Sequence, residues 1–333
     1  MAKIVIAGHA SCDLPLRPVD REVFETDTVF VDKIEVCTGG DALNVTVGLN
    51  KLGLGDKAKY VTVVGDDLFG RITVDILKEL GIDTSGVIVK CEADSIATCI
   101  LIDKNNERHF VFSGNSSRKI NVEDVIGNIE GDTEYLHIGS FMSLDSLEFE
   151  NSGILFKKAK EMGLHTSFDV TFDDSGRWLE KIKPALPYTD IFFASYDEAV
   201  ALSGGLKEPF AIADYFGNFG IKKAVIKLGP KGCYITDYEG IGELIPAFEG
   251  VKVVDTTGAG DAFVAAYLFG LLSGFSMREC AVLGNANGAL AIGKVGANVG
   301  SASRSQIIEF LKGKDSLNPA IGGLLEKLAY LIA

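Results

Sequence analysis

Short apolar runs alternate with helix-periodic segments along the 333-residue chain, and this alternation restricts its fold more than any other feature. Several runs are apolar at nearly every position, which is typical of strands that helices cover on both faces of a sheet. The predicted strands are residues 3–7, 60–64, 135–138, 165–168, 190–193, 223–227 and 251–254. The predicted helices are residues 42–52, 70–80, 153–162, 197–202, 259–272 and 278–292. This succession requires right-handed crossovers and predicts an α/β fold, with a mostly parallel sheet between two helical layers.

Two segments, residues 14–36 and 90–112, interrupt the alternation. Both show the apolar–polar pattern of strands, and neither is followed by a helix at the expected place. They could pair with each other as a small sheet over the carboxyl ends of the central strands, where open α/β sheets bind ligands. They could equally extend the main sheet at an antiparallel edge. No linker or internal repeat divides the chain, so we expect a single domain over residues 1–333.

The composition excludes several classes of protein. The chain has 46 acidic and 32 basic residues and a formal net charge of −14, whereas a general nucleic-acid binder needs a basic face. Its longest uncharged stretch, residues 262–277, is shorter than the ~18 residues of a membrane span, and its start lacks the apolar region of a signal peptide. Its six cysteines form no C-x-x-C pair, and its four histidines form no zinc motif. We therefore expect a cytoplasmic protein with reduced thiols and no nucleic-acid or membrane partner.

The strongest chemical signal is DTTGAGD at residues 255–261, which joins an apolar run to a long helical pattern. Gly258, Ala259 and Gly260 let the backbone approach a ligand, and their N–H groups lie at the positive end of the helix dipole. Such a turn suits the charge on a transferred phosphoryl group. Asp261 would lie beside it, where a carboxylate could accept a hydroxyl proton. The alternative is a glycine-rich loop in which Asp261 only caps the helix.

A second signal is GGDALN at residues 39–44. Gly39 and Gly40 expose backbone N–H groups at a predicted helix start, and Asn44 places an amide near the same point. Asp41 and Asn44 suit an uncharged ligand rich in donors, such as a polyol. The alternative is an ordinary glycine turn followed by a helix cap.

These two segments, at this separation, resemble the two signatures of the ribokinase-like (PfkB) carbohydrate kinases, and the resemblance covers essentially the whole chain. It implies a three-layer α/β sandwich whose β-sheet lid is built from residues 14–36 and 90–112. It also implies transfer of the γ-phosphoryl group of ATP to a sugar hydroxyl. By this resemblance Asp261 is the general base, and the turn from Gly258 to Gly260 is the anion hole. The implied sugar contacts are Asp13, Gly39, Gly40, Asp41 and Asn44.

The resemblance also implies nucleotide and metal contacts. KLGPKG at residues 227–232 matches the family's T-L-G-x-x-G turn along ATP, with Lys227 in place of threonine. The implied ATP contacts are Lys227, Gly229, Lys231, Gly232, Thr256, Asn285 and Ser195. Ser195 replaces the family's asparagine, and Glu198 is implied to organise the water shell of Mg²⁺. Some members also bind a monovalent cation such as K⁺, and the matching residues are Asp255, Thr257, Gly296 and Ser301.

The substrate implied is an unphosphorylated sugar, because the negative charge of Asp41 would repel a sugar phosphate. A nucleoside is the main rival, since aromatic side chains at Phe24, Phe30, Phe110 and Phe112 could stack on a base. An acid sugar is a further alternative, because Arg108 and Arg118 could bind its carboxylate. A non-catalytic sugar or nucleotide sensor and, more remotely, a nicotinamide dehydrogenase are alternatives from other classes. The apolar alternation of the two lid segments, which no helix covers, predicts a homodimer joined through the lid.

Overall fold

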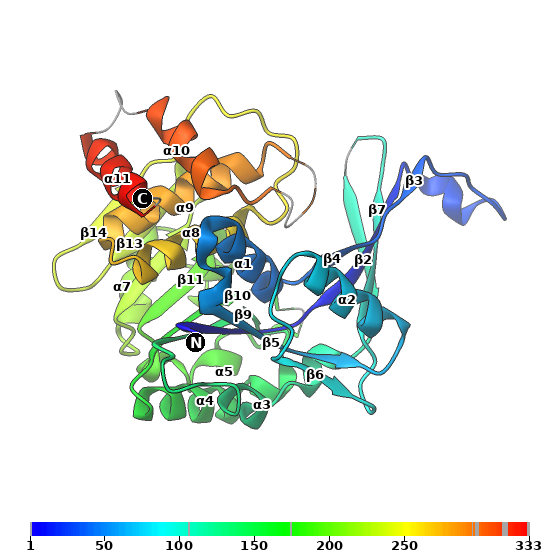
Figure 1. Cartoon of the computed structure of the whole chain (residues 1–333), viewed down its shortest axis with the longest axis horizontal. Helices are drawn as coiled ribbons and strands as arrows, with labels where there is room; N and C mark the ends of the chain where they lie inside the picture. Colours follow the sequence, from blue (N-terminus) through cyan, green and yellow to red (C-terminus); the bar gives the residue numbers. More distant parts are fainter. Residues whose placement is uncertain are drawn as a thin grey trace.

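The structure, a computed structural model, describes residues 2–105, 107–173, 175–294, 296, 300–314 and 319–331. Its central strands are β1 (Ile4–Ala7), β5 (Ala58–Gly65), β6 (Val87–Lys90), β9 (Tyr135–Phe141), β10 (His165–Val170), β11 (Ile191–Ser195), β12 (Lys223–Lys227), β13 (Cys233–Thr236) and β14 (Gly242–Ile245). Within the described residues they form one nine-stranded sheet in the order β14-β13-β12-β11-β10-β9-β1-β5-β6 (Figure 1). From β6 to β12 all neighbours are parallel, and β13 and β14 extend the sheet as antiparallel strands. The predicted α/β class with a mostly parallel sheet is confirmed.

Helices cover both faces of this sheet (Figure 1). They are α1 (Asp41–Leu49), α2 (Leu68–Glu79), α3 (Val122–Ile126), α4 (Glu150–Glu161), α5 (Leu179–Ile182), α6 (Tyr196–Leu202), α7 (Pro209–Gly217), α8 (Ala259–Leu272), α9 (Met277–Ala291), α10 (Arg304–Lys312) and α11 (Pro319–Tyr330). Short 3₁₀ turns lie at Arg21–Phe24, Gly55–Lys57, Ser116–Lys119, Asp145–Leu147, Leu186–Tyr188 and Gly229–Lys231, and a π turn at Asn50–Leu54. One core packs under α1 and α8 to α11, and the other under α3 to α7. In β1, Ile4 and Ile6 enter the first core while Val5 and Ala7 enter the second, which explains the continuous apolar run.

The two interrupting segments pair with each other in a separate sheet, which we call the lid sheet. It contains β2 (Ser11–Arg17), β3 (Lys33–Ile34), β4 (Cys37–Gly39), β7 (Ile96–Ile102) and β8 (Arg108–Ser113). Strand β2 runs parallel to β7, with Leu14 opposite Cys99, and β7 is antiparallel to β8. The lid sheet projects beside the main body of the molecule (Figure 1).

The predicted strand at residues 251–254 is wrong. These residues are irregular, and the Val253 and Val254 side chains are 61% and 42% exposed. No strand of the described structure pairs with them. The N–H groups of Val254 and Asp255 bond instead to the carbonyl of Ile292 at the end of α9, at 2.7 and 3.1 Å. An apolar run therefore forms no strand here, because its backbone groups bond to a helix end.

The prediction also omitted several elements. Strands β13 and β14 were missed because each is short and pairs only through an antiparallel turn after β12. Helices α3, α5, α7, α10 and α11 were missed, and β6 was assigned in part to the lid segment. None of the helices in the described ranges combines the length and apolarity that a bilayer crossing requires.

Candidate active site

The two signature segments meet at the carboxyl ends of the central strands. Asn44 lies in the second turn of α1, and Asp261 lies in the first turn of α8. The Asn44 Nδ2 atom donates a hydrogen bond to Asp261 Oδ2 at 2.7 Å, across a separation of 217 residues in the chain. Contact between these helices therefore unites motifs that the sequence holds far apart.

The carboxyl groups of Asp261 and Asp41 lie at this contact, and the pKa values of both are raised. Burial is the main cause that raises the pKa of Asp261 well above its ordinary value, and the charge of Asp41 adds to it. Burial also raises the pKa of Asp41 to about 6, with a contribution from Asp169. The hydrogen bond from Asn44 and the positive charge of Lys227 oppose the shift at Asp261. A carboxylate with a raised pKa is suited to accept a proton.

Asn44 offers an unused acceptor beside this base. Its Oδ1 atom is buried and has no hydrogen-bond partner among the described residues, while its Nδ2 atom is held by Asp261. A buried acceptor without a partner costs about 1–3 kcal/mol. A substrate hydroxyl that donates to Asn44 would remove this penalty, so the residue fits a polyol ligand.

The predicted sugar contacts gather around the start of α1. The Asp13 carboxylate accepts a hydrogen bond from Ser11 Oγ at 2.7 Å, and burial raises its pKa. A Cβ atom at Gly39 would lie 2.2 Å from Asp13 Oδ2, so a larger residue there would displace the Asp13 carboxylate. Gly40 has φ 107°, and a Cβ there would lie 2.3 Å from the carbonyl oxygen of His9. These glycines therefore allow β4 to lie against the strand that carries Asp13.

Lys227 places a positive charge at the predicted anion hole. Its ammonium group forms an ion pair with Asp169 at the end of β10, and the lysine side chain is 14% exposed. Burial would lower the pKa of Lys227, but Asp169, Glu198 and Asp261 together raise it. The Nζ atom lies 3.3 Å from where a Cβ at Gly260 would be. The charge therefore lies against the turn that precedes Asp261.

Asp255 shapes the turn from its other side. Its Oδ1 atom accepts from the Thr257 N–H at 2.7 Å, and Oδ2 accepts from the Gly296 N–H at 2.8 Å. Gly258, with φ 73°, then caps α8 in the left-handed conformation. Of the N–H groups that follow, those of Ala259 and Ala262 bond to the carbonyl oxygens of Thr256 and Gly258, at 3.3 and 2.8 Å. Those of Gly260 and Asp261, in the first turn, have no acceptor within the helix. The turn thus presents donors to an anion, as its sequence predicts.

The predicted nucleotide contacts lie mainly at the ends of β11 and β12. Gly229, Lys231 and Gly232 form the turn between β12 and β13, and Thr256 is exposed in the loop before α8. Ser195 and Glu198 cap α6 reciprocally: Ser195 N–H donates to Glu198 Oε2 at 2.7 Å. Burial is the main cause that raises the pKa of Glu198, while Lys227 opposes the shift.

Asn285 has a structural role that the sequence did not predict. Its Nδ2 atom donates to the carbonyl oxygens of Ile245 and Pro246, both at 3.1 Å, and the residue is buried. It therefore fixes the segment after β14 against α9. A contact with adenine stays a prediction.

Sequence reasoning left three site residues out of its set. Asp169 pairs with Lys227, the Ser140 Oγ atom accepts from the Asp41 N–H at 3.2 Å, and Arg108 pairs with Asp255 at 2.5 Å. Asp169 had a signal, because it ends a predicted central strand. Arg108 was considered only as a contact for an acid sugar, and Ser140 had no signal, because both roles depend on contacts across the fold.

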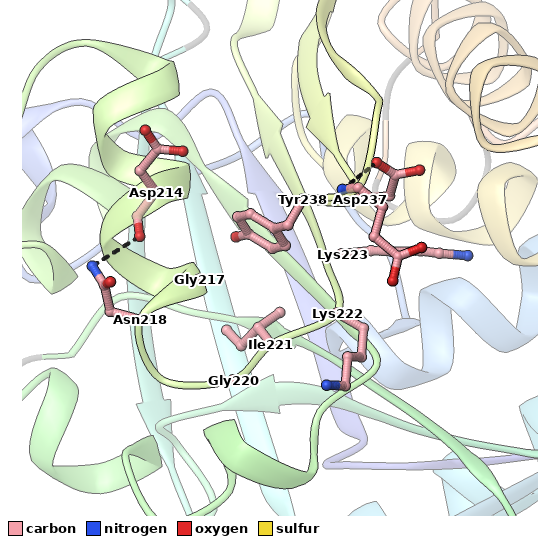
Figure 2. Close-up of a pocket in the computed structure, with 10 residues that line it drawn as sticks. Asp214, Gly217, Asn218, Gly220, Ile221, Lys222, Lys223, Asp237 and Tyr238 are labelled. Atoms are coloured by element: carbon pink, nitrogen blue, oxygen red, sulfur yellow. Dashed lines mark hydrogen bonds between the residues drawn. The ribbon is translucent and has the colours of Figure 1, made fainter.

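One hollow of the described structure lies next to this site, and another lies at the opposite end of the sheet. One of about 390 Å³ lies between β8 and the loop before α8. It is lined by Arg108, Phe110, Val253, Val254, Asp255, Thr256 and Thr257. The other, of about 930 Å³, is shown in Figure 2 and is lined by residues such as Asp214, Lys223 and Tyr238. Lys223 begins β12 whereas Lys227 ends it, so the larger hollow lies at the opposite end of the sheet from the signature motifs.

Comparisons with known proteins agree with this arrangement. The model of the pfkB family carbohydrate kinases matches residues 1–304. The chain is 31% identical over 254 residues to an uncharacterized sugar kinase of Archaeoglobus fulgidus, covering 76% of this chain and 98% of that protein. It is 30% identical over 279 residues to fructokinase-2 of Oryza sativa subsp. japonica, covering 78% and 80%.

Solved structures show the same fold. Ribokinase from Thermotoga maritima matches with a TM-score of 0.79 and 24% identity, over 94% of this chain and 100% of that one. Fructokinase with bound ATP from Xylella fastidiosa matches with a TM-score of 0.78 and 22% identity, over 95% and 100%. Because the family model spans most of the sequence and both signature segments meet in space, the chain belongs to the pfkB family of carbohydrate kinases.

Proposed function

We propose that this protein transfers the γ-phosphoryl group of ATP, as its Mg²⁺ complex, to a hydroxyl group of an unphosphorylated sugar. The contact between Asn44 and Asp261 carries the proposal, because it joins a hydroxyl-binding amide to a base at an anion-binding helix start. Family membership supports the reaction class. The negative charge of Asp41 beside the base disfavours a substrate that is already phosphorylated. The nucleoside alternative is not favoured, because the curated relatives include sugar kinases and fructokinases.

The residues present can supply alignment, charge and a proton acceptor. Asn44 would orient the sugar hydroxyl, and Asp261 would accept its proton. The N–H groups from Gly258 to Gly260 and the ammonium of Lys227 would stabilise charge on the transferred group. Bound Mg²⁺ supplies further charge neutralisation on the phosphates, and it prefers water and one or two carboxylates. Glu198, beside Lys227 and Asp169, fits such a water-mediated contact.

The proposal is tested by a coupled assay of ADP release over a panel of sugars and nucleosides, with binding measured in parallel. We expect ADP release that depends on an unphosphorylated sugar and on Mg²⁺. Sugar binding without ADP release would instead assign a sensor. A preference for nucleosides over all sugars would overturn the choice of substrate.

Replacing Glu198 by glutamine should raise the Mg²⁺ concentration needed for the half-maximal rate, because a neutral amide holds the hydrated ion less strongly. The measurement is the rate as a function of Mg²⁺ at saturating ATP and sugar. Asp197→Asn is the matched control, since Asp197 is exposed in the first turn of the same helix. Equal Mg²⁺ dependence in the two variants would remove Glu198 from the metal site.

We also propose a homodimer joined through the lid sheet. Large apolar side chains lie exposed on it and beside it: Phe112 in β8 is 68% exposed, and Phe30, in the segment between β2 and β3, is 94% exposed. A second copy would cover these side chains and the edge strands. Light scattering should give twice 35.6 kDa for the protein and a lower mass for Phe112→Asp. Phe210→Asp, at an exposed phenylalanine of α7, should leave the mass unchanged. A monomer at all concentrations would end this proposal.

Two further proposals concern the domain organisation and the cellular location of the protein. We propose that residues 1–333 act as one kinase domain, in which the lid sheet covers the site. We propose the cytoplasm as its location, supported by free thiols at Cys12, Cys37, Cys91, Cys99, Cys233 and Cys280.

A further inference from the structure

An ion pair ties the lid sheet to the loop that forms the anion hole. The Nη2 atom of Arg108, at the start of β8, lies 2.5 Å from Asp255 Oδ2. The side chains are 18% and 1% exposed, so water screens the pair weakly. Arg108 also lines the 390 Å³ hollow with Thr256 and Thr257. The pair therefore lies at the junction of lid and anion hole.

Asp255 links Arg108 to the backbone of the turn. Its carboxylate also holds the N–H groups of Thr257 and Gly296, so both of its oxygens accept hydrogen bonds in addition to the ion pair with Arg108. Thr257 immediately precedes Gly258, the residue that starts the anion hole. A buried carboxylate needs a compensating charge, and Arg108 provides it. The order of the turn thus depends on a side chain that the lid carries.

The cation that the family resemblance implies at this place does not fit the described residues. Asp255 already faces a guanidinium group. The carbonyl oxygen of Ser301 accepts from Lys51 Nζ at 3.2 Å, and its Oγ accepts from Asn287 Nδ2 at 3.2 Å. Cationic side chains thus already approach Asp255 and Ser301, where a monovalent cation would need free oxygens. Residues 295 and 297–299 lie outside the described part of the chain.

We propose that Arg108 is a positioning residue, which supplies from the lid the positive charge that Asp255 requires and makes the anion hole depend on lid closure instead of a bound monovalent cation. The catalytic part of this inference rests on the proposed kinase function. With the lid displaced, Asp255 loses its partner and the turn loses its support. With the lid in place, the donors at Gly258 to Gly260 are held ready for the transferred group.

The test compares Arg108→Met with Arg17→Met. Arg17 also lies in the lid sheet and pairs with Glu35 at 2.5 Å, but that pair is more than one-third exposed and outside the site. Arg108→Met should still fold, because Val254 and Asp255 keep their backbone bonds to Ile292. Hydrogen exchange at the Thr257 and Gly296 amides should accelerate about tenfold or more in Arg108→Met and stay unchanged in Arg17→Met.

Kinetics provide the second measurement. Misplacement of the turn should lower kcat about 10–100-fold in Arg108→Met, with a smaller change in the KM for ATP. Arg108→Lys, or guanidinium ion added at millimolar concentration to Arg108→Met, should restore part of kcat. The unaltered protein should show equal rates and equal melting temperatures in Na⁺, K⁺ and a bulky organic cation.

Two results would overturn the proposal: exchange at Thr257 that is the same in both methionine variants, or a specific gain in melting temperature and rate from K⁺ in the unaltered protein. The hydrogen-exchange measurement needs no substrate. If no sugar is phosphorylated but exchange at Thr257 accelerates in Arg108→Met, the link between lid and loop holds and the kinase proposal fails.

Discussion

Asp261→Asn is expected to lower kcat by about 10²–10⁴ without loss of folding, because it removes the proton acceptor and keeps the shape of the side chain. The affinity for ATP should stay the same or increase, since one negative charge beside the phosphates disappears. The melting temperature should rise or stay constant, because burial and the charge of Asp41 destabilise the ionised carboxylate of Asp261. Steady-state kinetics, ATP titration and thermal unfolding on this variant measure all three effects.

The pH dependence of kcat gives a second test of Asp261 as the base. A base must be deprotonated to act, so kcat should fall as the pH is lowered through the apparent pKa values of the Asp41–Asp261 pair. The pKa of Asp41 is raised to about 6, so this acid limb should lie higher than for an ordinary carboxylate. Asp197→Asn, in the first turn of another helix, should leave the profile unchanged. Near-normal kcat in a folded Asp261→Asn protein would exclude Asp261 as the base.

Lys227→Met is expected to cause the largest loss of stability, about 3–5 kcal/mol at neutral pH, because it leaves a buried acidic partner uncompensated. Asp169 loses its ion pair, and Asp41, Glu198 and Asp261 each lose a favourable charge interaction. The loss should be measured by denaturant unfolding. Activity should fall as well, since the same ammonium group lies against Gly260.

The loss should depend on pH in a definite direction. The pKa values of Asp41, Glu198 and Asp261 are raised in the folded protein and should rise further without Lys227. A carboxyl group with a folded pKa above its unfolded value destabilises the fold increasingly as the pH rises from about 4 through the folded pKa. The deficit of Lys227→Met should therefore shrink on acidification.

Two further variants isolate the cause. Lys90→Met is the matched control, because Lys90 pairs with Asp124 at 2.6 Å and both side chains are similarly shielded, at 16% and 14% exposed. Lys90 lies away from the acidic cluster of Asp41, Asp169, Glu198 and Asp261. Lys90→Met should therefore lose less stability than Lys227→Met. Adding Asp169→Asn to Lys227→Met should recover part of the stability. Equal losses in the two lysine variants, at every pH, would contradict the cluster as their cause.

The sequence by itself determined the layers of the fold and the place of the chemistry. Strand and helix periodicities are local, so runs such as residues 3–7 and 223–227 show which segments both helical layers cover. Glycines before a helix are also local signals, and they marked the turn at Gly258 and the start of α1. The ends of parallel strands lie at one edge of the sheet, so these motifs could be assigned to one site.

Only the tertiary structure decided which side chains meet. Residues 251–254 are apolar enough for a strand, but their backbone bonds to the end of α9. The pairs Asn44–Asp261, Lys227–Asp169 and Arg108–Asp255 join segments from different elements. No local pattern encodes such contacts, because they depend on how helices pack and how far each strand extends before its turn. Burial then sets the protonation of the acids they hold, and this too arises only when the distant segments enclose them.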